Sequence, residues 1–193
     1  MKRRSLRIAL DRLAARGEMF VTDRQLRQIF NDESASFTVM LHRHVKAGVV
    51  LRLCPGVYLN PSAVTEQSVT LSDAVRHVRP DGVHYVSLES ALYHHGMVDC
   101  RPPELHLMSS GTSYVFDTIL GRIVFRHTNR RPDQIQAGLC VTTFEGLPVA
   151  SCATAVEDMI RTCRPLPPRF RGKPLRWNRD VLVADTGAQL PGN

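Results

Sequence analysis

Apolar residues recur every three to four positions in three stretches of the first fifty residues. This spacing is typical of helices that bury one face, and it predicts helices over residues 5–16, 23–30 and about 36–47. Thr22 and Gln25 stand at the spacing of a capping box just before the second helix. We expect that helix to turn its large apolar side chains inward, namely Leu26, Ile29 and Phe30.

The third predicted helix has one apolar and one polar face. Phe37, then Met40 or Leu41, then His44 or Val45 fall on one side of it at helical spacing. The other side carries small, polar and basic residues: Ser36, Thr38, Val39, His42, Arg43 and Lys46. We therefore expect the helix to pack by the first side and to expose the second.

Two β-rich runs follow, at residues 49–53 and 57–59, and the sequence Cys54-Pro55-Gly56 separates them. Such runs around a Pro-Gly turn predict a hairpin. Three short helices followed by a hairpin is the element order of a winged helix-turn-helix. The pattern therefore predicts a winged helix-turn-helix domain over residues 1–61.

Residues 62–163 predict a second domain of mixed α/β type, so that the whole chain is expected to be an α+β protein. Helices are expected over residues 71–79, 88–95 and 152–163, with Ser87 and Ser151 as N-caps of the last two. The final helix is expected to bury Ala155, Val156, Met159 and Ile160. Strands are expected over residues 83–86, 104–108, 113–120, 122–127, 140–144 and 147–149.

Residues 164–193 have a different composition. Pro165, Pro167, Pro168 and Pro174 interrupt this stretch, and six basic residues are spread along it. We interpret it as an extended or partly disordered basic tail, which can bind DNA beside the first domain or serve as a solubilising extension.

Charge is distributed unevenly along the chain. Residues 1–60 contain 11 Lys and Arg against 5 Asp and Glu, residues 61–163 contain 8 against 11, and residues 164–193 contain 6 against 2. A basic head, a mildly acidic body and a basic tail indicate that a polyanion would bind at the two ends.

The remaining composition is that of an ordinary globular protein. No stretch approaches the roughly 18 to 20 apolar residues of a membrane span, and residues 1–7 lead into an amphipathic helix and not into a signal peptide. The five cysteines are scattered without a Cys-x-x-Cys pair, as in reduced proteins. We therefore expect a cytoplasmic protein.

The basic head and the exposed side of the third helix predict a DNA interface. Side chains of a helix in the major groove read base edges, while flanking cations hold phosphates. Arg43 is the candidate for pairing with guanine, and Arg52 in the hairpin is a candidate for backbone or minor-groove contact. The predicted DNA-binding residues are Lys2, Arg3, Arg4, Arg7, Ser34, Ser36, Thr38, His42, Arg43, Lys46 and Arg52. The alternative for such a polar face is simple solvation.

Motifs for metal or catalytic chemistry are weak. His94 and His95 are adjacent, so they point about a hundred degrees apart on a helix and rarely bind one metal. Glu104 and Asp117 lie in a strand-rich region, but a nuclease core would also need a lysine, and residues 61–163 contain none. Ser87 and Ser151 lack the Gly-x-Ser-x-Gly context of a nucleophile. We predict no enzyme, no metal site and no cofactor.

Two segments carry a resemblance to a known family. Residues 51–61, Leu-Arg-Leu-Cys-Pro-Gly-Val-Tyr-Leu-Asn-Pro, resemble the wing of the antitoxin regulators of abortive-infection E systems, the AbiEi family. Residues 85–96, Tyr-Val-Ser-Leu-Glu-Ser-Ala-Leu-Tyr-His-His-Gly, resemble the segment that opens the second domain of that family. The tail from residue 164 departs from the family pattern.

The resemblance implies a two-domain regulator whose winged helix binds inverted repeats of double-stranded DNA in its own promoter. It also implies a functional pairing with a nucleotidyltransferase-type toxin in a type IV system, in which direct contact is not required. By position it assigns base reading to Ser36, Thr38, His42 and Arg43. We therefore predict an autorepressing antitoxin that acts by excluding polymerase. The alternative is a protein-interaction module with a non-reading winged helix, which binds a toxin or other protein through its second domain.

Overall fold

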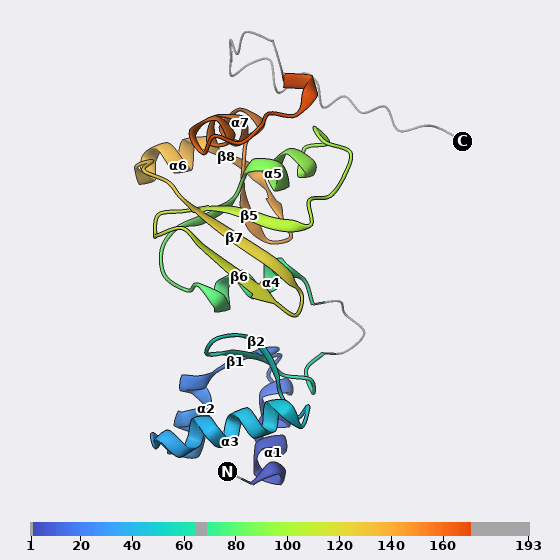
Figure 1. Ribbon diagram of the computed structural model, residues 1–193, viewed down its shortest axis with the longest axis vertical. Helices are drawn as coiled ribbons and strands as arrows, with labels where there is room; N and C mark the ends of the chain where they lie inside the picture. Colours follow the sequence, from blue (N-terminus) through green and yellow to red (C-terminus); the bar gives the residue numbers. More distant parts are fainter. Residues whose placement is uncertain (1, 65–68, 171–193) are drawn as a thin grey trace, which may run out of the picture. The chain divides into compact units, whose positions relative to one another are not determined.

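The computed structural model describes residues 2–64 and 69–170 (Figure 1). The chain divides into two compact units, and the division passes through the strands around residues 103–124. The first unit contains residues 1–82, 103–105 and 114–124, and the second contains the rest of the chain. The predicted domain boundary at residue 61 stays a prediction.

The first unit begins with three helices and a small sheet. Their bounds are α1 Arg3–Ala14, β1 Phe20–Thr22, α2 Asp23–Phe30, α3 Ala35–Lys46, β2 Leu51–Cys54 and β3 Val57–Leu59. The three strands form an antiparallel sheet in the order β1-β3-β2, with Val21 opposite Tyr58 and Leu51 opposite Leu59. The short strand β1, which directly precedes α2, is thus paired with β3.

A single core joins these helices and strands. Each helix contributes buried apolar residues, the sheet contributes Val21 and Tyr58, and the segment before β2 contributes Val49 and Val50. The buried members are Leu6, Leu10, Leu13, Val21, Leu26, Phe37, Leu41, Val49, Val50 and Tyr58. Phe30 and Val45 are partly buried against them.

The predicted start of α2 is confirmed. The Gln25 backbone N–H donates to the Thr22 hydroxyl at 3.1 Å, and the Thr22 N–H donates to Oε1 of Gln25 at 2.8 Å. This capping box satisfies two backbone groups that a helix start leaves open. The prediction for Ile29 is wrong, because its side chain is 46% exposed. In a helix of only eight residues, Leu26 fills the core and Ile29 lies beyond it.

Asn60 ties the end of the small sheet to α1. Its side chain is fully buried, and its amide donates to the Leu10 carbonyl at 2.8 Å. Its backbone N–H donates to the Met19 carbonyl at 2.8 Å. A buried amide with these partners fixes where the chain leaves β3, because each lost hydrogen bond would strand a polar group.

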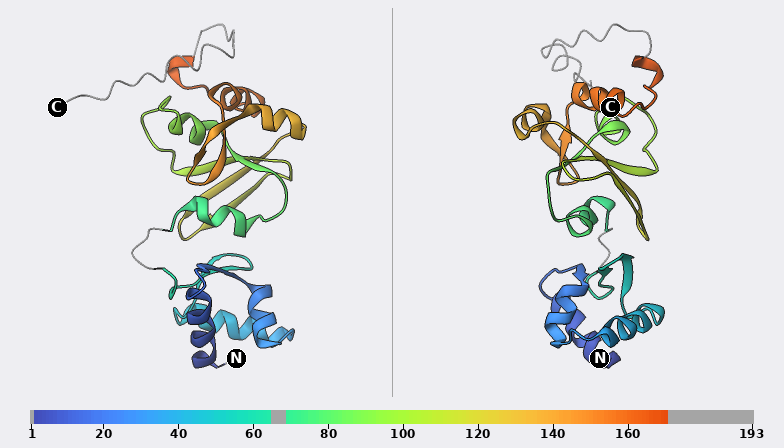
Figure 2. Two further views of the ribbon diagram at one scale, coloured as in Figure 1. Left: turned by 180° about the vertical axis from the view of Figure 1, so that it is seen from behind. Right: turned by 60° about the vertical axis from the view of Figure 1, so that its left-hand side comes forward.

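Mixed α/β structure follows in residues 69–170. Its elements are α4 Leu71–Val78, β4 His84–Val86, α5 Leu88–His94, β5 Glu104–Ser109, β6 Tyr114–Thr118, β7 Gly121–His127, α6 Pro132–Gly138, β8 Leu139–Phe144, β9 Leu147–Ala150, α7 Cys152–Arg161 and the 3₁₀ turn Pro168–Phe170. The strands run in the order β6-β7-β5-β4-β9-β8. β4 is antiparallel to β5 and parallel to β9. In the second unit, α5 packs beside α7 (Figure 2).

Several predictions for this region are corrected. The helix α6 was not predicted; it begins with Pro132 at its first position, where proline is well tolerated. Ile160 is 48% exposed and not buried. Ser151 caps α7 as expected, since its hydroxyl accepts from the Thr154 N–H. Ser87 does not cap α5, because its hydroxyl makes no cap hydrogen bond.

Most of the predicted basic tail, residues 171–193, lies outside the described residues. Among the helices that the structure describes, none is long and apolar enough to cross a membrane.

Candidate nucleic-acid interface

The helix α3 separates its residues into a buried and an exposed side, as predicted. Phe37 is fully buried and Leu41 is 1% exposed, so these two anchor the helix on the core. The side chains on the opposite side are all exposed: Ser36, Thr38, Val39, His42, Arg43 and Lys46. Five of them offer hydrogen-bond donors, and two of these five, Arg43 and Lys46, are cations. Val39, which is 54% exposed, offers the methyl groups that contact thymine in major-groove recognition.

Arg27 on α2 organises the turn into α3. Its Nε donates to Asp23 at 2.7 Å, and its two terminal nitrogens donate to the Ser34 carbonyl at 3.1 Å and to the Thr38 hydroxyl at 2.7 Å. The guanidinium also lies 4.9 Å from the Phe37 ring centre. The hydrogen bond to Asp23 raises the pKa of Arg27, so this cation stays charged. Arg27 therefore fixes the first turn of α3 relative to α2.

Sequence analysis did not find Arg27. The signal that could have found it is the Asp23-x-x-x-Arg27 spacing, which places two opposite charges on neighbouring turns of one helix. Its remaining contacts cross to α3 and have no signature in the sequence.

Three hydroxyl groups stand at the start of α3, and two of them are already engaged with each other. The Ser34 hydroxyl donates to Asp32 and lies 2.8 Å from the Ser36 hydroxyl. The hydrogen bonds from Ser34 lower the pKa of Asp32, which keeps it ionised. Thr38 accepts from Arg27 and retains its own O–H as a donor. Thr38 is therefore better prepared to meet an incoming acceptor than Ser34.

The predicted phosphate-binding cations are exposed and lack carboxylate partners. Lys2, Arg3, Arg4 and Arg7 lie at the N-terminal end of α1, and no acidic residue stands in its first turn. Cations at this end oppose the helix dipole, which costs stability. Within the described residues, none of Lys2, Arg3, Arg4, Arg7, Arg43, Lys46 and Arg52 forms an ion pair. By contrast, ion pairs engage Arg27, Arg101, Arg122, Arg130, Arg131 and Arg164.

Arg52 lies on the hairpin of β2 and β3, whose tip is held close to α2. The Asp23 backbone N–H donates to the Gly56 carbonyl at 2.9 Å, and Gly56 adopts a φ of 78° that favours glycine. Arg52 stands opposite Tyr58 in the strand register, next to a bulge before Cys54. The hairpin is thus short and fixed, with Arg52 as its exposed cation.

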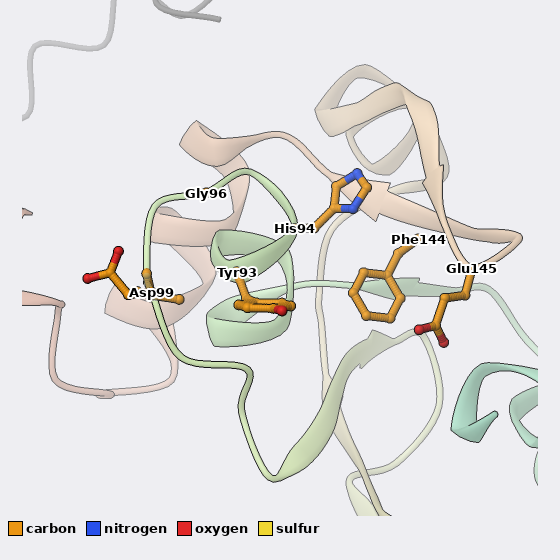
Figure 3. Close-up of a pocket in the computed structure, with 7 residues that line it drawn as sticks. Tyr93, His94, Gly96, Asp99, Phe144 and Glu145 are labelled. Atoms are coloured by element: carbon orange, nitrogen blue, oxygen red, sulfur yellow. The ribbon is translucent and has the colours of Figure 1, made fainter. Parts of the chain in front are cut away.

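The second unit contains a hollow of about 530 Å³ beside the end of α5 (Figure 3). Tyr93, His94, Asp99, Phe144 and Glu145 are among the side chains around it. Glu145 is engaged by Arg101 at 3.0 Å, in an ion pair of two partly exposed groups. Burial and the neighbouring His95 lower the pKa of His94. The carboxylates of Asp99 and Glu145 lie on opposite sides of the hollow (Figure 3).

The candidate metal and nuclease residues have other contacts. The Nε2 atom of His95 lies 2.8 Å from the Ala150 carbonyl oxygen, so this nitrogen already has a hydrogen-bond partner. Arg122 bridges Asp117 at 2.6 Å and Glu104 at 3.1 Å, so both carboxylates are paired with an arginine. In the part of the chain that the structure describes, no three His, Cys, Asp or Glu side chains are grouped as metal ligands.

A buried polar cluster that the sequence did not reveal surrounds Asp158. This side chain is fully buried in α7, and its carboxylate accepts from the hydroxyls of Tyr85 at 3.1 Å and Ser87 at 2.8 Å. Arg130 donates to it through Nε and a terminal nitrogen. Ser87 therefore serves this cluster and not the start of α5. Burial and the nearby carboxylate raise the pKa of Tyr85. The cluster connects β4, α7 and the segment before α6.

Comparison with protein families bears on the first unit. Residues 7–61 match a family described as AbiEi antitoxin transcriptional regulators. The resemblance to the AbiEi family is thereby confirmed for residues 7–61. The match covers α1 from Arg7, the other two helices and the three-stranded sheet, so it includes the exposed side of α3. No curated protein matches the chain.

Proposed function

We propose that this protein is a sequence-specific DNA-binding transcriptional regulator. In this proposal α2 and α3 form a helix-turn-helix, α3 is the reading helix, and β2 and β3 form the wing. The observation that carries the proposal is the exposed side of α3, which is rich in donors and lies in the same unit as seven exposed cations that form no ion pair with a described residue. The family match over residues 7–61 supports a role in transcription regulation.

Base reading is assigned to the middle of α3. Arg43 can donate two hydrogen bonds to guanine, and His42 and Thr38 can reach neighbouring base edges or phosphates. Arg27 supports this role by holding the first turn of α3, which fixes the direction in which the proposed base-reading side chains extend. Lys2, Arg3, Arg4 and Arg7 act on phosphates and carry no sequence information.

The finer biological role is proposed from the family description. We propose an autorepressing antitoxin of the cytoplasm, whose operator contains inverted repeats and overlaps its promoter. It pairs functionally with a nucleotidyltransferase-type toxin and need not touch it. Repression follows from steric exclusion of polymerase when α3 occupies the major groove.

The test is a fluorescence-anisotropy titration of the full chain with the DNA upstream of its gene. A shuffled duplex of equal composition serves as competitor, at two salt concentrations. We expect specific binding that weakens with salt, because bound cations displace counter-ions from DNA. Arg43→Ala should lower the preference for the upstream DNA by about ten- to a hundredfold, as the loss of a bidentate base contact does.

A phosphate-contact variant and a control sharpen this test. The double variant Arg3→Gln, Arg4→Gln should weaken both duplexes alike and reduce the salt slope by about 0.9 for each phosphate that the chain no longer neutralises. Arg161→Ala, which removes an exposed cation from α7 in the second unit, should change neither. If Arg43→Ala and the double variant act alike on both duplexes, the assignment of reader and phosphate contact is wrong. Cleavage of either duplex with magnesium or manganese would instead indicate a nuclease.

A further inference from the structure

The helices α1 and α2 enclose a groove that the proposed DNA interface does not use. Its volume is about 480 Å³. α1 contributes most of the lining, and the end of α2 contributes the rest. The lining residues are Ser5, Ile8, Ala9, Arg12, Leu13, Arg16, Ile29 and Phe30.

Two large apolar side chains in this groove are exposed. Ile8 is 45% exposed and Ile29 is 46% exposed, although Leu6 and Leu10 of the same region are fully buried. They come from different helices and line one concave surface, so they form one apolar patch and not scattered surface residues. The walls of the groove therefore favour an apolar ligand.

Two arginines line this groove. Arg12 lies in α1 four residues after Ile8 and therefore on the same side of the helix, and Arg16 lies in the turn that follows Ala14, the last residue of α1. Like charges that line one groove repel each other. Neither guanidinium has an ion pair or hydrogen bond to a described residue, and no carboxylate lines the groove. An anion between Arg12 and Arg16 would relieve their repulsion.

We propose that this groove binds a small organic acid with an apolar body, an aliphatic or aromatic carboxylate. The apolar part would cover Ile8 and Ile29, and the carboxylate would accept hydrogen bonds from the guanidinium of Arg12 or Arg16. This assignment does not depend on DNA binding, because none of the lining residues belongs to the proposed DNA interface.

The size of the groove favours a small molecule over a protein partner. Small-molecule sites have volumes of about 300–1,000 Å³, and the groove lies within this range. A stable protein interface needs roughly 800 Å² on each partner. Two exposed isoleucines and a narrow cleft between two helices provide much less apolar contact than that.

The experiment uses decanoate as the probe and the full chain labelled at its isoleucine δ1 methyl groups. Decylamine, which has the same chain and the opposite charge, is the matched probe. Below the concentrations at which either probe aggregates, decanoate should shift the methyl signals of Ile8 and Ile29 saturably. Decylamine should leave them in place. Equal shifts with both probes would overturn the proposal, because the arginines would then not distinguish a carboxylate from an ammonium group.

Variants test the two halves of the site separately. The double variant Arg12→Gln, Arg16→Gln should weaken decanoate binding at least about tenfold, and Ile29→Ala should weaken it as well, while circular dichroism shows both variants folded. Arg161→Gln is the control and should bind as the parent does. Unchanged binding in the arginine variant overturns the proposal. So does movement of the Ile8 and Ile29 signals with protein concentration alone, since a second copy would then occupy the groove.

Discussion

Arg27 connects two helices through one side chain. It is the partner of Asp23 on its own helix, of the Ser34 carbonyl at the turn and of Thr38 on α3. Its guanidinium serves these three acceptors from three different nitrogens, whereas a lysine ammonium would have to serve them from one, so lysine is not an equivalent replacement. The orientation of α3 thus depends on an arginine that is not among the predicted DNA-binding residues.

Asn60 allows a stability prediction at the scale of one residue. Replacing it with alanine removes the hydrogen bond from its buried amide to the Leu10 carbonyl, which joins the end of the small sheet to α1. We expect Asn60→Ala to lower the free energy of unfolding by about 0.5–1.5 kcal/mol. Urea unfolding measures this, with the exposed neighbour variant Ser62→Ala as control. Equal effects of the two variants would show that the buried hydrogen bond contributes little.

Tyr85 gives a prediction for alkaline pH. Its pKa is raised in the folded protein by burial and by Asp158, whereas in the unfolded chain it ionises near pH 10. The unfolded state therefore loses this proton first, and stability should fall as pH rises above about 10. Tyr85→Phe should reduce this fall, and the exposed Tyr114→Phe should not.

Other raised pKa values limit how complete that rescue is. Burial also raises the pKa of Tyr58 and of the Cys54 and Cys140 thiols, so part of the fall should remain in Tyr85→Phe. Urea unfolding at pH 9 and pH 11 measures the difference. A fall of equal size in Tyr85→Phe and in the parent chain would contradict the assignment.

At the scale of elements, Asp158 connects α7 to β4 and to the segment that carries Arg130. Asp158→Asn removes the buried charge opposite Arg130, whose side chain is only 9% exposed. Breaking a buried pair on one side commonly costs about 3–5 kcal/mol. Because Arg130 keeps Glu157 as a partner, we expect a loss of about 3 kcal/mol in this variant.

The matched control for Asp158 is its neighbour Glu157. Glu157 also pairs with Arg130, at 2.8 Å, but its side chain is 44% exposed. Exposed ion pairs contribute about 0–1 kcal/mol, so Glu157→Gln should stay within that range. Chemical unfolding of both variants measures the two losses of unfolding free energy. A larger loss for Glu157→Gln than for Asp158→Asn would show that the exposed pair, and not the buried cluster, holds α7.

The elements were predictable where one local signal was strong. The capping box of Thr22 and Gln25, the helical row of Phe37 and Leu41, and the N-cap at Ser151 depend on neighbours within a few residues. Asp158 was not predictable, because its partners are 28 to 73 residues away in the chain. The exposed Ile29 was also missed, since a helical pattern shows which residues share a side but not how far the core extends.

In the candidate interface, too, some properties could be predicted from the sequence and others could not. Exposure of the eleven predicted DNA-binding residues follows from helix periodicity and charge, and all eleven are exposed. Their contact with DNA stays a prediction. The engagement of Ser34 with Asp32, and the clamp of Arg27 on Thr38, depend on the turn between α2 and α3 and could not be derived from spacing alone.

At the scale of the whole molecule, the arginines of α1 and those of the structure after the small sheet differ in whether they form ion pairs. Arg122, Arg130 and Arg164 form ion pairs in the structure that follows the small sheet. Those of α1 do not, among the residues described. The charge difference along the sequence is therefore also a difference in how cations are neutralised, since the arginines of α1 have no carboxylate partner among the described residues.

The crowded cations of α1 have a consequence for heat stability in the absence of DNA. Repulsion among them is strongest in the compact state, so added salt should raise the melting temperature of the free protein by screening it. The same salt weakens the proposed DNA complex. Calorimetry at low and moderate salt, with and without duplex, should therefore show two opposite trends. The free protein would melt most easily in dilute buffer, the condition in which bound DNA protects it most.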